Sequence, residues 1–129
     1  MYERNPFPCP GLFLRIVGTP VSKENIKLVR EADKTVTNIL KKNNLTKNFS
    51  QLIVALLGIN SVGVKGDERV YGHSLAVRAV QTSDFMTAKG YYFQPVVVDE
   101  ITNALTKHKN IVRVFFDMTP KPPATTEFE

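Results

Sequence analysis

Apolar residues recur at three- and four-residue steps from Ser22 to about Lys42, which is the spacing of one face of an α-helix. Lysines and acidic residues fill the positions between them. Ser22 is suited to cap the first turn, because a serine hydroxyl accepts a hydrogen bond from a free backbone N–H there. We therefore predict a long amphipathic helix. Its apolar stripe consists of Ile26, Val29, Ala32, Val36, Ile39 and Leu40.

A second, shorter helix is predicted to begin at Pro95. Proline is favoured in the first turn of a helix because the N–H that it lacks would have no partner there. Residues 82–94, which precede this helix, show no clear period, and we expect a loop. The inner face of the second helix would consist of Val98, Ile101, Ala104 and Leu105.

Several short stretches are predicted as strands, because they are rich in aliphatic and β-branched residues and are bounded by turn residues. A charged turn at residues 66–69 would join two of them. In the last strand we expect Val112, Val114 and Phe116 to share one side. The predicted strands are residues 12–17, 52–57, 61–65, 70–81 and 111–118.

The order of these elements indicates an α+β fold, described in short as β-α-β-β-α-β. We expect a two-layer sandwich, in which two helices cover one face of a mostly antiparallel sheet of four to five strands. The other face of the sheet would then have no partner within the chain. Because an open apolar face is unfavourable in water, we expect a symmetric homodimer formed through it.

The length of 129 residues and the 43% share of hydrophobic residues fit one globular domain over residues 1–129. No apolar stretch approaches the roughly 18 residues of a membrane span, and no signal-peptide pattern is present, so we expect a cytoplasmic domain without membrane contact. The single cysteine, Cys9, excludes an internal disulfide. With only His73 and His108 beside it, we also expect no metal site.

The net charge of +5 leaves three classes of surface open: one that binds nucleic acid, one that binds a phosphorylated small molecule, and one that is simply solvated. An independent basic module that binds RNA on its open sheet face is one alternative. RNA-binding sheets usually present aromatic residues among basic ones. The central strand here carries small aliphatic residues such as Ala76, Val77 and Ala79, so we expect no nucleic acid partner.

Catalytic motifs are missing from the chain. It has no phosphate-binding glycine loop and no Gly-x-Ser-x-Gly elbow. His73 and His108 have no nucleophile close in sequence, and Cys9 between two prolines has no feature that would lower the pKa of its thiol. We therefore predict no catalytic residue.

Three segments are candidates for ligand binding: the Pro/Gly-rich arm at residues 6–11, the glycine-containing stretch at residues 61–69, and the tail at residues 121–129. An arginine and a lysine on stiff segments suit a phosphate group. The alternative interpretation is that these are only turn glycines, chain ends and solvated charges.

Four sequence motifs indicate the protein family more closely than composition does. They are Arg4 to Leu12, with Pro-Phe-Pro-x-Pro-Gly-Leu at its centre; Ser-Val-Gly-Val-x-Gly-Asp-x-Arg at residues 61–69; Thr-Ser-Asp-x-Met-Thr at residues 82–87; and Asp-x-Thr-x-Lys-Pro-Pro-Ala-Thr-x-Glu-Phe-Glu at residues 117–129. In this order they resemble the C-terminal dimerisation domain of GMP synthase (glutamine-hydrolysing), over essentially the whole chain.

This resemblance implies a place in a ligase of purine biosynthesis that converts xanthosine monophosphate (XMP) to GMP. ATP and magnesium would be used by an ATP pyrophosphatase domain and glutamine by a glutaminase domain, while this domain would dimerise the enzyme and hold XMP without binding a cofactor. The charged turn would reach the pocket of the dimer partner. The family's XMP contacts map onto Gln51, Asp67, Arg69, Lys121 and Glu127, with Pro8, Gly11 and Thr126 alongside.

The sequence departs from the family pattern at Asn5, Cys9 and Phe128, where the family has histidine, glycine and tryptophan. The Ser-Gly-Gly-Val-Asp-Ser loop of the pyrophosphatase domain and the Cys-His-Glu set of the glutaminase are not found in these 129 residues. We therefore expect the chain to correspond to one domain of a longer enzyme, either excised or naturally truncated, and to be inactive by itself.

Overall fold

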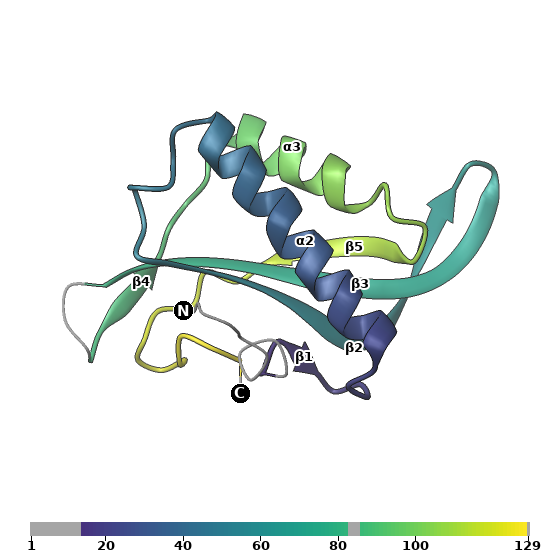
Figure 1. The fold of residues 1–129 in the computed structure, drawn as a ribbon, viewed down its shortest axis with the longest axis horizontal. Coiled ribbons are helices and arrows are strands. Elements are labelled where there is room, and N and C mark those ends of the chain that lie inside the picture. The colour runs from purple at the N-terminus through teal and green to yellow at the C-terminus, as the bar shows by residue number, and fades with distance from the viewer. Residues whose placement is uncertain (1–13, 83–85, 129) are drawn as a thin grey trace.

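A computed structural model describes residues 14–82 and 86–128 of the chain (Figure 1). The beginning of the first predicted strand lies outside the described residues. So do Asn5, Pro8, Cys9 and Gly11.

The long helix is confirmed as α2 (Lys23–Lys42). Ser22 caps it, because its Oγ accepts a hydrogen bond of 3.1 Å from the backbone N–H of Asn25. The helix ends at Lys42 with Asn43 as its C-cap, and Asn44 follows with a φ of 59°, which turns the chain away. Its buried face is the predicted stripe with one exchange, since Leu28 is buried and Ile26 only half-buried.

The second helix is confirmed as α3 (Pro95–Leu105). Ile101 and Leu105 are buried as predicted, whereas Val97 takes the buried position expected for Val98, which is half-buried. An ion pair of 2.6 Å between Lys42 Nζ and Glu100 Oε2 joins the two helices at the surface. Hydrogen bonds from Lys42 and Asn43 hold the pKa of Glu100 below its usual value.

The sheet is built around a long antiparallel hairpin of β2 (Gln51–Lys65) and β3 (Glu68–Thr82). The prediction of two separate strands at residues 52–57 and 61–65 was wrong, because both belong to β2. Between them the register shifts in an irregularity that spans Leu57 to Ser61. The polar and glycine residues there resemble a turn in sequence, but pairing with β3 resumes beyond them.

Three short strands complete the sheet. β1 (Ile16–Val17) runs parallel to β2, β4 (Ala88–Gly90) runs antiparallel to β3, and β5 (Ile111–Phe116) runs parallel to β3. β4 lies within the stretch predicted as a loop, because three paired residues are too few to produce a sequence period. The sheet is therefore mixed, with its longest pairing antiparallel, and the α+β sandwich is confirmed.

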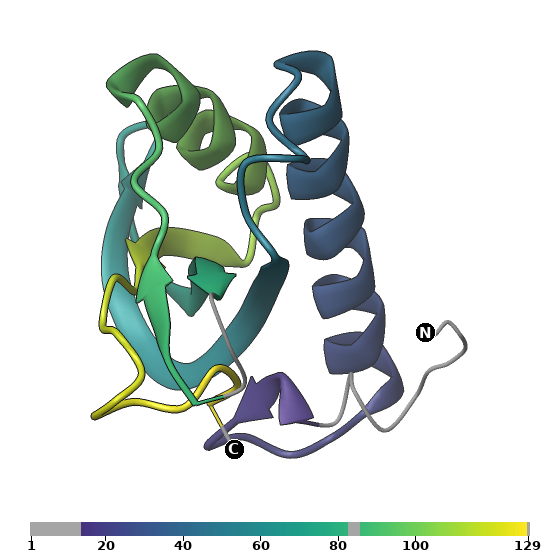
Figure 2. The same ribbon diagram turned by 90° about the vertical axis from the view of Figure 1, so that its left-hand side faces the viewer.

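The two helices cover one face of this sheet and enclose the core with it (Figure 2). No helix in the described part of the chain is long and apolar enough to cross a membrane. The core contains Val29, Val36 and Leu40 of α2, Val54 and Leu56 of β2, Leu75 and Val77 of β3, Ile101 and Leu105 of α3, and Ile111 of β5.

The opposite face of the sheet is not open at its centre, which corrects the expectation of an uncovered apolar face. Ile53, Ala55, Ala76 and Val80 alternate with the core residues along β2 and β3, and all are buried within the single chain. The segment that follows β5 contacts this face through Arg78, as described below. The apolar centre of the sheet therefore needs no second copy to cover it.

Candidate functional site

The last described residues, 117–128, form a non-regular segment that we call the C-terminal segment. Its only regular pairing within the described residues is a bridge between Lys121 and Ala88 of β4. The N–H of Lys121 donates to the oxygen of Ala88 at 2.8 Å, and the N–H of Ala88 donates back at 3.0 Å. The backbone of Lys121 is thereby fixed against the edge of the sheet.

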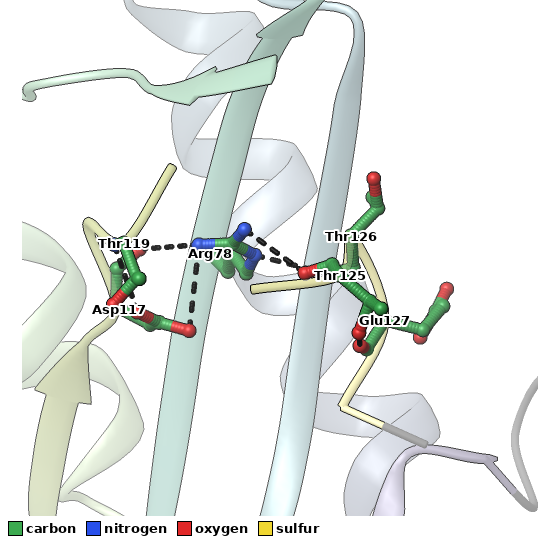
Figure 3. Close-up of polar contacts among 6 residues, drawn as sticks. All are labelled: Arg78, Asp117, Thr119, Thr125, Thr126 and Glu127. Atoms are coloured by element: carbon green, nitrogen blue, oxygen red, sulfur yellow. Dashed lines mark hydrogen bonds and ion pairs between the residues drawn. The ribbon is translucent and has the colours of Figure 1, made fainter. Parts of the chain in front are cut away.

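Arg78 of β3 holds the C-terminal segment at both ends (Figure 3). Nε donates to the oxygen of Thr126 and Nη2 to that of Thr125, both at 3.0 Å. On the other side, Nη1 lies 3.4 Å from both the backbone oxygen and Oδ2 of Asp117. Arg78 is only 1% exposed, so these contacts replace nearly all of its hydration.

Glu127 is held by a second arginine. Its Oε2 accepts a hydrogen bond of 3.2 Å from Arg15 Nη2, and Arg15 Nη1 lies 3.7 Å from Oδ1 of Asp33. Burial raises the pKa of Asp33, while the charge of Arg15 opposes this shift. The other oxygen of Glu127, Oε1, is buried and has no hydrogen-bond partner among the described residues. Among the described residues, the carboxylate of Glu127 is thus bonded to Arg15 through Oε2.

A small open pocket lies beside the bridge of Lys121. Its volume is about 360 Å³. Gln51 begins β2 opposite Val80, at the same end of the sheet, and is exposed. The cavity is lined by Gln81, Thr82, Thr87, Ala88 and Lys89.

Asp67 and Arg69 lie far from these residues within the chain. Asp67 lies in the turn of the hairpin. Arg69 follows it within β3, so the turn is shorter than predicted. Both lie beyond the end of β2 opposite Gln51, about 45 Å away along a strand that rises about 3.3 Å per residue. The structure therefore brings Gln51 and Lys121 to one end of the sheet and places Asp67 and Arg69 at the other.

The outer part of the hairpin is anchored to the loop after α3. Lys65 Nζ donates to the backbone oxygens of Thr106 and His108 at 2.7 and 2.8 Å. Gly63 and Gly72 pack against Val112, since a Cβ at either position would lie 2.8 Å from its side chain. Val112 therefore contacts the hairpin instead of sharing a side with Val114 and Phe116, which corrects the prediction. A register shift between His73 and Ser74 in the pairing with β5 accounts for this.

The opposite side of this outer hairpin is exposed. Val62 pairs with Tyr71 and Val64 with Arg69, so these four residues share one side. Val64 is 74% exposed and Tyr71 73%. An arginine thus lies within a small apolar surface, which we call the hairpin surface.

The two arginines that organise the C-terminal segment, Arg78 and Arg15, were missed by the sequence analysis. Arg78 could have been recognised from the sequence, because it is the one charged residue among residues 74–80. The other side chains there are small or aliphatic. A charge at the centre of a strand predicted to be buried needs partners. Arg15 had no comparable signal.

No cluster of three or more His, Cys, Asp or Glu side chains able to hold a metal ion was found in residues 14–82 and 86–128. A groove of about 590 Å³ lies between α2 and α3, and none of the predicted site residues lines it. Its floor is apolar, with Leu28, Ala32 and Ile111, and charged residues such as Glu31 and Lys107 form its rim.

These features define a small α+β domain whose C-terminal segment is fixed beside a small pocket. The chain belongs to the family described as the GMP synthase C terminal domain, whose model matches residues 38–128. Relatives named GMP synthase [glutamine-hydrolyzing] match almost the entire chain. The protein of Candida albicans is 42% identical over 98% of this chain, that of Bdellovibrio bacteriovorus 43% over 100%, and that of Thermus thermophilus 43% over 98%.

The chain spans about a quarter of the length of these relatives, with 24% of the Candida protein and 26% of the Bdellovibrio protein covered. The resemblance found in the sequence motifs is thereby confirmed at the level of the family.

Proposed function

We propose that this chain is the XMP-binding and dimerisation domain of a GMP synthase that makes GMP from XMP, ATP and glutamine. The observation that carries the proposal is the fixed C-terminal segment, in which Lys121 is bridged to β4 beside a small pocket in a chain of this family. In this proposal ATP and magnesium are used by the ATP pyrophosphatase domain of the same enzyme. This domain binds no cofactor and catalyses nothing by itself.

Each proposed ligand contact has a physical basis. The ammonium group of Lys121 suits a phosphate as a point charge. Glu127 offers a buried acceptor, Oε1, that has no partner among the described residues, and a ribose hydroxyl is a donor that would satisfy it. Gln51 is exposed and can donate to an oxygen of the ligand. Thr126 supports the segment through its backbone oxygen, which accepts from Arg78.

Asp67 and Arg69 are proposed to act in the pocket of a dimer partner, because the length of β2 separates them from Lys121 in their own chain. The hairpin surface favours this arrangement, since its exposed Val64 and Tyr71 flank Arg69 and would be covered by a second copy. We therefore propose that a homodimer forms through the hairpin surface, and not through the buried centre of the sheet.

A titration of the chain with XMP tests the ligand. The part of the pocket that encloses the base would belong to the pyrophosphatase domain, so we expect weak binding with a Kd in the millimolar range, about −4 kcal/mol. Lys121→Ala should weaken binding further. Lys41→Ala, on the exposed side of α2, removes the same charge and should leave binding unchanged. Equal effects of the two substitutions would show general electrostatic attraction and contradict a site.

The same titration with an oligonucleotide, at two salt concentrations, tests the alternative of an RNA-binding module. The sheet face that such a module would use has a buried centre here, and its arginine is bonded to the C-terminal segment. Tight binding that weakens steeply with salt would favour the alternative over the proposed function.

A further inference from the structure

We infer that Arg78 is a positioning residue for the ligand site, which it serves by fixing the C-terminal segment that carries Lys121. This inference rests on the proposed function, because it concerns how Lys121 is presented to XMP. Arg78 itself would not touch the ligand, since the residue is 1% exposed and each of its three guanidinium nitrogens contacts the C-terminal segment.

The first argument is the cost of burying the charge. A buried guanidinium loses its hydration and needs a charged partner and several hydrogen bonds to offset that loss. Arg78 has one carboxylate, that of Asp117, and three backbone oxygens. Every one of these partners belongs to the C-terminal segment. The charge is therefore compensated only when this segment is in place.

The second argument is the position of Lys121 between the contacts. Asp117 lies four residues before Lys121, and Thr125 lies four residues after it. One guanidinium thus closes residues 118–124 into a short loop, and the bridge to Ala88 fixes the middle of that loop. Ordering a loop before the ligand arrives lowers the entropy lost on binding.

The third argument is the geometry of arginine. Its planar fork of five N–H donors reaches Asp117 on one side and Thr125 and Thr126 on the other (Figure 3). A lysine ammonium at the same place is a compact group and cannot bond to both sides. A charged residue of either type would satisfy Asp117, but only arginine joins the two ends of the loop.

Substitution of Arg78 by methionine tests the inference. Methionine fills much of the space with an apolar side chain, so the hydrophobic layers can remain intact. Two quantities are measured on the whole chain: the Kd for XMP, and hydrogen exchange of single backbone amides. The amides of Lys121 and Ala124 report on the segment, and that of Leu56, bonded to Arg15, reports on the sheet.

For Arg78→Met we expect at least a fivefold weaker affinity for XMP, and at least tenfold faster exchange at Lys121 and Ala124 with unchanged exchange at Leu56. Arg78→Lys should recover only part of both effects. Arg113→Met, which removes an exposed arginine from β5, should change neither quantity and controls for net charge. A purely structural role would accelerate exchange at Leu56 as well.

Asp117→Asn is the milder second variant, which removes the ion pair and leaves the other contacts of Arg78. It should produce smaller changes in the same direction, so the inference can be tested even if Arg78→Met does not fold. Faster exchange of the segment with a Kd for XMP within twofold of the unaltered chain would overturn the positioning role alone. Absence of XMP binding by the unaltered chain would overturn the proposed function and the positioning role with it.

Discussion

Arg78 and Arg69 lie nine residues apart on the same strand, yet their surroundings are opposite. Arg78 is buried, with its guanidinium bonded to Asp117, Thr125 and Thr126. Arg69 is exposed near the start of β3, next to the turn of the hairpin and beside exposed apolar residues. The difference separates two uses of the same side chain, because a buried arginine stabilises its own chain and an exposed one remains available to another molecule.

The largest effect is expected from removal of Arg78, with removal of Arg69 as the comparison. Arg78→Ala leaves a void and three unsatisfied backbone oxygens, so the free energy of unfolding should fall by about 3 kcal/mol. Arg69→Ala removes an exposed side chain and should change it by less than about 0.5 kcal/mol. Urea unfolding of both variants measures the two values. Losses of similar size would contradict the comparison.

Dimerisation, in contrast to stability, should depend on the exposed hairpin surface around Arg69. Light scattering on a size-exclusion column at micromolar concentration should give about twice the chain mass of 14.5 kDa. Tyr71→Asp introduces a charge at the hairpin surface and should weaken the dimer at least tenfold, about 1.4 kcal/mol. Tyr92→Asp is the matched control, because Tyr92 is 77% exposed but lies outside the hairpin. A monomer before any substitution, or equal loss in both variants, would exclude the hairpin surface as the interface.

The smallest effect is expected at the surface ion pair of Lys42 and Glu100. The pKa of Glu100 is lowered in the folded chain. Its carboxylate therefore stabilises the fold at any pH above the ordinary pKa of 4.5. This contribution is lost as the pH falls through the lowered pKa of the folded chain. Glu100→Gln should remove that part of the pH dependence and barely change stability at pH 7. Urea midpoints at pH 7 and pH 3 provide the test, and a large loss at pH 7 would be inconsistent with an exposed pair.

The sequence predicted the elements whose signal is local. α2 and α3 follow from a helical period, Ser22 and Pro95 mark their first turns, and the glycine turn marks the hairpin. β4 was not predicted, because its three residues are strand only through pairing with β3. The single β2 was divided for a similar reason, since an irregularity within a strand has the composition of a turn.

The candidate site was predicted less completely than the fold. Lys121 and Glu127 were named through family motifs, and their role as ligand contacts stays a prediction. The structure places both in one fixed segment. The partners of Arg78 were beyond prediction, because they lie 39 to 48 residues further along the chain and three of them are backbone oxygens. A backbone oxygen has no sequence signature.

That choice of partners determines which changes the C-terminal segment tolerates. Every amino acid, proline included, carries a backbone oxygen, so replacement of Thr125 or Thr126 by another residue leaves the acceptors of Arg78 in place. Insertion or deletion of one residue between Asp117 and Thr125 would instead shift the acceptors away from a guanidinium that cannot follow. The length of the segment is therefore more strongly constrained than the identity of its residues.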